Sequence, residues 1–155
     1  MSHQAVLFDL DGTLLDTLAD LGDSMNRVLL RAGFPEHPLE AYRYFVGDGM
    51  EKLAFRALPA DSRDSANTAR ITTAMKEEYD RHWADKTQPY PGIPELLAEL
   101  DKEGNPLAVF SNKPDEFTRK MIAAFFPGRR FGAVIGARPG VPKKPDPGVP
   151  LEIAA

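Results

Sequence analysis

Two aspartates stand close together near the start of the chain. Asp9 and Asp11 follow the apolar run 5–8, which predicts a buried strand of a parallel sheet. A spacing of two places both side chains on one side of an extended segment, and open α/β sheets carry their sites at the carboxyl ends of strands. Neighbouring carboxylates repel each other unless a divalent cation such as Mg²⁺ lies between them or one carboxyl holds a proton. The pair therefore predicts either a cation site or an acid catalyst.

The next two residues extend this candidate site. Gly12 permits a tight turn and a close approach of the backbone, and Thr13 offers a hydroxyl and an amide that could contact an anion. A plain turn at the end of a strand, stabilised by the Asp-Gly pair, is the alternative for a lone motif of this kind.

Ser111 and Asn112 follow a second apolar run, 107–110, and precede Pro114, which suits the first turn of a helix. Either residue could serve simply as the N-cap of that helix. The same geometry would also direct free N–H groups at an anion above the sheet. Both interpretations stay open on these residues alone.

Lys144 stands in a rigid setting, just before Pro145 and Pro147 and after a third predicted strand. A solvated lysine is the ordinary interpretation of a single Lys. The alternative is a cation that offsets the charge developing on a phosphate in a transition state.

The elements that must position these residues fall into two groups. Apolar residues at helical spacing predict helices in the first group, and a break at 89–92 precedes a second group in which strands and helices alternate. The predicted helices span 17–32, 39–45, 50–58, 62–83, 94–103 and 114–126, and the predicted strands span 5–8, 107–110 and 131–135. The pattern favours an α/β fold, a doubly wound, Rossmann-like parallel sheet with a helical segment inserted after the first strand.

Composition limits the function classes. The chain has 155 residues, with 19 Lys and Arg against 23 Asp and Glu, so no basic field exists to attract nucleic acid. The absence of cysteine excludes disulfides, thiolate zinc sites and a cysteine nucleophile. No apolar run approaches the length that crosses a bilayer. We expect a cytoplasmic protein, a monomer or homodimer, that binds neither nucleic acid nor membrane.

Three ordered motifs carry a resemblance to a known family. Residues 6–14 (VLFDLDGTL), 109–113 (VFSNK) and 144–147 (KPDP) resemble the first three motifs of the haloacid dehalogenase superfamily, close to its phosphoglycolate phosphatase and β-phosphoglucomutase branch. The resemblance implies a catalytic core formed by 1–15 with 89–155 and a helical cap formed by 16–88. Within that cap, Gly47, Asp48 and Gly49 resemble the loop that faces the substrate.

The resemblance also implies roles for individual residues. Asp9 would attack phosphorus and form an aspartyl-phosphate, and Asp11 would act as general acid and then as general base. The Asp9 carboxylate and the Asp11 backbone carbonyl would hold Mg²⁺. Lys144 would contact the phosphoryl oxygens together with Gly12, Thr13, Ser111 and Asn112. The implied activity is Mg²⁺-dependent hydrolysis of a small phosphorylated metabolite, such as 2-phosphoglycolate.

The family's fourth motif, an acidic loop that supplies further Mg²⁺ ligands, is not found. Only residues 145–155 follow Lys144, and the expectation is a core truncated at its C-terminus. Three alternatives stay open: a sugar-phosphate mutase, a catalytically deficient remnant that binds phosphate or a partner, and a receiver that accepts phosphoryl groups. The helical insertion argues against the receiver.

Overall fold

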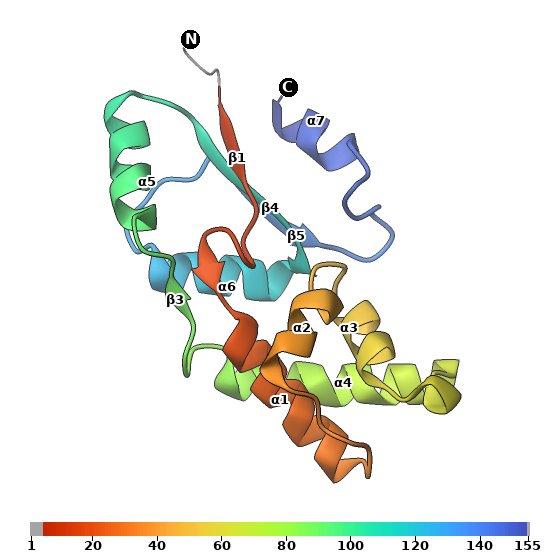
Figure 1. Ribbon diagram of the computed structural model, residues 1–155. Coiled ribbons are helices and arrows are strands. Elements are labelled where there is room, and N and C mark those ends of the chain that lie inside the picture. The colour runs from red at the N-terminus through yellow and green to blue at the C-terminus, as the bar shows by residue number, and fades with distance from the viewer. Residues whose placement is uncertain (1–4, 155) are drawn as a thin grey trace. The chain divides into compact units, whose positions relative to one another are not determined.

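The computed structural model describes residues 5–154, which form two compact units (Figure 1). The first unit contains the described residues up to Asp16 and those from Gln88 onward, and the second spans Thr17–Thr87. Both ends of the chain therefore belong to one unit, and the second unit is an insertion into it. The functional division into core and cap remains a prediction.

A three-stranded parallel sheet forms the centre of the first unit (Figure 1). Its strand order is β1 (Val6–Phe8), β4 (Leu107–Pro114), β5 (Ala133–Ala137). The central strand β4 is buried over all its residues except the last. A parallel strand inside an α/β layer is covered on both faces, which explains the unbroken apolar run 107–110. The α/β fold class with a parallel sheet is confirmed.

Helices α5 (Ile93–Lys102), α6 (Asp115–Phe125) and α7 (Gly148–Ala154) complete the first unit, with α6 packed on β4 and β5. A two-residue ladder joins β2 (Leu15–Asp16) to β3 (Gln88–Pro89). Strand β5 begins two residues later than predicted, and β4 extends four residues further. Helix α7 and the small ladder have no counterpart in the sequence prediction, because the proline-rich tail reads as a loop and two-residue strands leave no periodic signal.

The regular elements described between residues 17 and 87, which form the second unit, are all helical. This unit contains α1 (Leu18–Arg31), α2 (Leu39–Phe45), α3 (Met50–Ala57), a short 3₁₀ turn η1 (Ala60–Ser62) and α4 (Ser65–His82). The single helix predicted for 62–83 is wrong at its start. Asp64 caps α4 by accepting the Asn67 N–H at 2.8 Å, and this hydrogen bond lowers the pKa of the Asp64 carboxyl.

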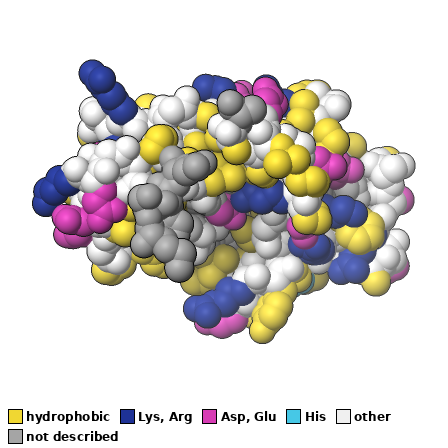
Figure 2. Space-filling view, turned by 90° about the horizontal axis from the view of Figure 1, so that it is seen from above, with side chains coloured by type: hydrophobic (Ala, Val, Ile, Leu, Met, Phe, Trp, Pro, Cys, Tyr) yellow, Lys and Arg dark blue, Asp and Glu magenta, His cyan; other side chains and the backbone are white. Residues whose placement is uncertain are grey.

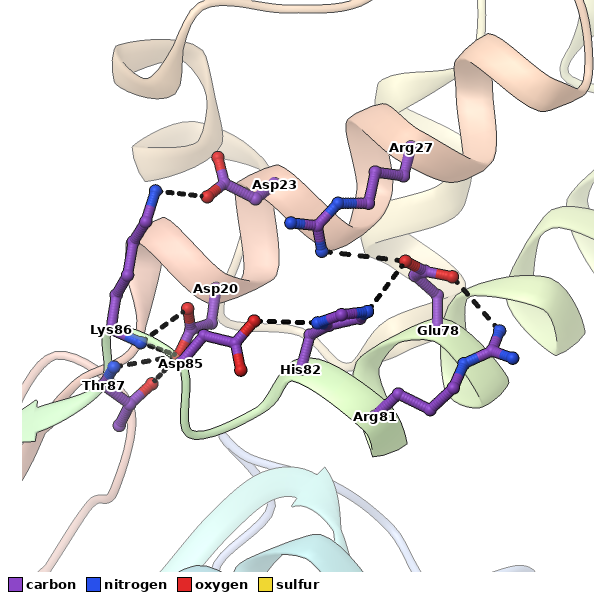
Figure 3. Close-up of polar contacts among 9 residues, drawn as sticks. All are labelled: Asp20, Asp23, Arg27, Glu78, Arg81, His82, Asp85, Lys86 and Thr87. Atoms are coloured by element: carbon purple, nitrogen blue, oxygen red, sulfur yellow. Dashed lines mark hydrogen bonds and ion pairs between the residues drawn. The ribbon is translucent and has the colours of Figure 1, made fainter.

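A buried carboxylate joins α1 to α4 in this unit (Figure 3). The Glu78 side chain is only 4% exposed and pairs with Arg31 at 2.8 Å, Arg81 at 3.1 Å, His82 at 3.4 Å and Arg27 at 3.6 Å. Burial by itself would raise the pKa of Glu78, but the hydrogen bond from Arg31 and the surrounding cations outweigh it, and the pKa is lowered. Glu78 is therefore held as an anion inside the helical unit.

A second buried carboxylate, Asp20, fixes the end of the helical unit (Figure 3). Both of its oxygens accept the Lys86 N–H at 3.0 Å, and one accepts the N–H and the hydroxyl of Thr87 at 2.8 Å each. The residues that lead out of the unit are thus tied to the first turn of α1. Nearby, Lys86 pairs with Asp23, and that hydrogen bond raises the pKa of Lys86.

The surface carries charges of both signs. Acidic and basic side chains alternate with hydrophobic ones on the face shown in Figure 2, in keeping with their similar numbers in the sequence. None of the helices between residues 5 and 154 combines the length and apolar character needed to cross a bilayer.

Candidate active site

The loop after β1 is organised around one buried residue, Leu10. Its carbonyl accepts the N–H groups of Thr13, Leu14 and Leu15 at 3.0 to 3.3 Å, while its side chain is fully buried. Gly12 adopts a φ of 77°, a left-handed conformation that favours glycine, and donates its N–H to Leu15. The strand itself ends at Phe8, and a turn at Leu10 separates Asp9 from Asp11, which forms an isolated β-bridge with Leu15.

Each of the two aspartates has a lysine of its own. Lys144 Nζ lies 2.9 Å from Asp9 Oδ1, and Lys113 Nζ lies 2.9 Å from Asp11 Oδ1. The two ion pairs differ in exposure. The Asp9 side chain is 44% exposed, whereas that of Asp11 is 14% exposed and that of Lys113 is 3% exposed. The repulsion expected between the carboxylates is thus offset by two ammonium groups, one accessible to solvent and one buried.

Asn112 connects the second motif to the third. Its Oδ1 accepts the Lys144 N–H at 2.9 Å, and its side-chain amide donates to the Lys144 carbonyl at 3.4 Å. The Lys144 Nζ also lies 5.3 Å from the centre of the Phe110 ring, on the same strand as Asn112. These contacts hold the loop that carries Lys144 against β4 and bring Lys144 to Asp9.

Ser111 lies inside β4, and its interpretation as a helix N-cap is wrong. The strand continues to Pro114, α6 begins at Asp115, and Pro114 is the N-cap residue, without a side-chain cap. The same finding removes the N-cap interpretation of Asn112. Ser111 is 1% exposed, and its hydroxyl accepts the Lys113 N–H at 3.1 Å. Its role in phosphate binding stays a prediction, as do the roles of the exposed Gly12 and Thr13.

The loop predicted to face the substrate lies between α2 and α3 in the helical unit. Gly47 and Gly49 both have positive φ, at 125° and 91°, and Gly49 precedes the first turn of α3. Asp48 forms an ion pair with Arg56 at 2.5 Å, and Arg56 also donates to the Phe45 carbonyl at 3.1 Å. Arg56 therefore fixes this loop from within its own unit. A substrate-facing role for the loop stays a prediction.

Two charged residues had no predicted role. Lys113 pairs with Asp11, and Asp115 accepts the Gly136 N–H at 2.7 Å. Burial would raise the pKa of Asp115, but the Gly136 N–H and the Arg119 guanidinium beside it lower that pKa. The sequence prediction ended the strand at residue 110 and left Lys113 in a connection, where a lysine needs no partner. Only the longer β4 of the structure shows that Lys113 is buried.

The donors around β1 suit a hard divalent cation in kind. Mg²⁺ binds through one or two carboxylates and keeps waters or substrate phosphate in its other positions, so the Asp9 carboxylate and the Asp11 backbone carbonyl fit it. Among the described residues, no group of three or more acidic, His or Cys side chains is placed to hold a metal.

The three motifs lie within a match to a known protein family. Residues 6–154 match the family model of the haloacid dehalogenase-like hydrolases. The chain belongs to this family. Among curated members, it is 37% identical to the phosphoglycolate phosphatase of Pseudomonas putida over 92% of the chain, and 36% identical to that of Mesorhizobium japonicum over 95% of the chain. It spans 53% of the former protein and 66% of the latter, so it corresponds to between half and two thirds of these dehalogenase-like relatives.

Solved dehalogenase-like structures share the fold. A protein provisionally assigned as a phosphoglycolate phosphatase, from Lactobacillus delbrueckii subsp. bulgaricus, superimposes with a TM-score of 0.89 at 30% identity. That match covers 98% of this chain and 72% of the other. CbbY from Rhodobacter sphaeroides, solved in complex with phosphate, superimposes with a TM-score of 0.73 at 25% identity and covers 97% of this chain and 70% of its own.

Proposed function

We propose that this protein hydrolyses small phosphomonoesters of the phosphoglycolate type, with Asp9 as nucleophile. The observation that carries the proposal is the ion pair between Lys144 and Asp9 at the carboxyl end of β1, with Asp11 two residues further on. A carboxylate that is half exposed yet held beside a cation can meet an incoming phosphate. The names of the curated relatives support the same reaction class.

In the proposed reaction, an Asp9 oxygen attacks phosphorus, and the bond from phosphorus to the ester oxygen breaks. Asp11, which takes up a proton from solvent on the oxygen that does not face Lys113, gives that proton to the departing oxygen and later takes one from the water that hydrolyses the aspartyl-phosphate. Lys144 then offsets the charge on the phosphoryl oxygens at the site where it now neutralises Asp9. The buried Ser111 and Asn112 support this arrangement from β4, with Asn112 acting through the Lys144 backbone.

Mg²⁺ fits this proposal as a cofactor held by the Asp9 carboxylate and the Asp11 backbone carbonyl. When bound, it would neutralise the phosphate so that an anionic nucleophile can approach. Removing divalent cations with a chelator should abolish phosphate release, and adding Mg²⁺ back should restore it. Full activity in the presence of chelator would exclude this part of the proposal.

The test of the reaction is direct. Purified protein with Mg²⁺ should release inorganic phosphate from 2-phosphoglycolate, and Asp9→Asn should reduce the rate by about 10³-fold or more, because an amide is a poor nucleophile. Glu99→Gln is the matched control, since the Glu99 side chain is exposed on α5, where it pairs with Lys102. Equal activity of Asp9→Asn and wild type would overturn the mechanism. A sugar phosphate assayed in parallel would favour a mutase if it is isomerised without release of free phosphate.

A further inference from the structure

Lys113 is an unusual residue in its surroundings. Among the described residues of the first unit, it is the one charged side chain in the buried class. An ammonium group removed from water is costly unless it is paired and hydrogen-bonded. A lysine at this place in the central strand therefore calls for an explanation, since an apolar residue would fill the same space at lower cost.

The partner of Lys113 is Asp11, through a charge-assisted hydrogen bond of 2.9 Å. This contact joins two parts of the chain that are 102 residues apart in sequence. It lies in a drier setting than the pair of Lys144 with Asp9, whose side chains are 30% and 44% exposed. The carboxylate of Asp9 is thus the more accessible of the two, whereas Lys113, the partner of Asp11, is almost fully buried.

The backbone of Lys113 is itself fixed on three sides. Its N–H donates to the Ser111 hydroxyl at 3.1 Å, and its carbonyl accepts the Thr118 hydroxyl at 3.3 Å. Strand β5 approaches so closely that a Cβ at Gly136 would lie 2.6 Å from the Lys113 carbonyl oxygen. The ammonium group is thus delivered to Asp11 from a rigid part of the sheet.

We propose that Lys113 is a positioning residue for Asp11, which holds this carboxyl where it can serve the leaving group. The inference rests on the proposed function. One oxygen of Asp11 is bound to a fixed donor, so rotation of the carboxyl about its side-chain bonds is restrained. A displacement of a reacting group by about 1 Å can reduce the reaction rate about 10²-fold.

The test uses two substrates that differ in their need for a proton. An alkyl phosphate such as 2-phosphoglycolate leaves as a poor alkoxide that needs protonation, whereas p-nitrophenolate departs unaided. The measured quantity is kcat/KM, which reports the steps up to release of the leaving group and not the later hydrolysis. Lys113→Met should reduce kcat/KM by about 10²-fold for 2-phosphoglycolate and change it little for p-nitrophenyl phosphate.

A double variant separates positioning from a structural role. In an Asp11→Asn background there is no acid left to position, so adding Lys113→Met should cause no further loss with 2-phosphoglycolate. This variant also removes both partners of the buried pair, which keeps it folded better than the single variant. Thermal unfolding of each variant verifies folding, and Lys102→Met, on the surface of α5, is the control for a lost positive charge.

Should Lys113→Met not fold, Lys113→Arg replaces it and should show the same substrate dependence. Equal losses on both substrates, or a further loss in the Asp11→Asn background, would overturn the inference and leave the proposed function intact. A wild-type protein that releases no phosphate from either substrate would overturn the proposed function, and the inference with it.

Discussion

Lys144 Nζ lies 2.9 Å from Asp9 Oδ1, and the loop that carries Lys144 is held in place by the side chain of Asn112. The nucleophile proposed from the first motif and the cation proposed from the third therefore meet at one end of the sheet. The second motif provides the connection between them. The proposed phosphoryl transfer rests on this half-exposed pair taken together with Asp11 and with the family of the chain.

Replacing this lysine tests its electrostatic role. Lys144→Met should reduce kcat for a phosphomonoester by about 10²- to 10³-fold, because one fixed positive charge is lost where charge develops. Lys143→Met is the control, since Lys143 is exposed and has no role in the proposed site. Steady-state phosphate release measures both variants. A similar loss in both would attribute the effect to the loop rather than to the Nζ of Lys144.

Asp20 should be more important for stability than its neighbour Asp23. Asp20→Asn should lower the free energy of unfolding by about 2 kcal/mol, because the amide cannot accept all the hydrogen bonds from Lys86 and Thr87 and the site is buried. Asp23→Asn, which weakens one exposed ion pair with Lys86, should cost well under 1 kcal/mol. Urea unfolding followed by circular dichroism measures both. Equal costs would contradict the importance given to burial.

The lowered pKa values of Glu78 and Asp115 predict a loss of stability in acid. Each group binds protons less readily in the folded protein than in the unfolded chain, where Glu78 has its ordinary pKa of 4.5. The contribution of Glu78 to the free energy of unfolding is therefore complete well above pH 4.5 and is lost as the pH falls through the lower pKa of the folded state. The free energy of unfolding should begin to fall as the pH drops toward 4.5 and should continue to fall below it.

Glu78→Gln measures how much Glu78 contributes to the pH dependence of the free energy of unfolding. The variant should be less stable than wild type at neutral pH, since Arg31 and Arg81 lose a buried anion, and its stability should depend less steeply on pH in acid. Urea unfolding at several pH values measures the slope. A slope identical to that of wild type would show that other carboxyls account for the dependence.

Gly136 should tolerate no side chain. Gly136→Ala places a Cβ 2.5 Å from the Asp115 Cα and 2.6 Å from the Lys113 carbonyl oxygen, both backbone atoms that cannot move aside cheaply. The cost should be about 1 to 3 kcal/mol of unfolding free energy. At Gly132 the nearest atom is the Leu107 carbonyl oxygen at an ordinary 3.7 Å, so Gly132→Ala should change stability much less. Thermal unfolding of the two variants compares them.

Regular elements were predictable where a periodic pattern extends over several turns. The apolar stripe of α1 and the unbroken apolar run of β4 gave the correct type of element because each reflects burial along its own length. Ends were less predictable. Strand β4 continues through Ser111 and Asn112, whose polar side chains are typical of a helix cap, because contacts from Lys144 and within the strand satisfy them.

The sequence by itself determined the family, the parallel α/β sheet with its helical insertion, and most of the residues proposed for the site, since all three depend on residue types and local spacing. It could not determine which lysine pairs with which aspartate. Those pairs join residues far apart in the chain. Strand β4 holds Lys113 in a buried position against Asp11, whereas the pair of Lys144 with Asp9 is accessible to solvent. Burial and long-range contact are properties of the folded chain, and they alone distinguish the ion pair of Asp11, which is nearly buried, from the accessible ion pair of Asp9.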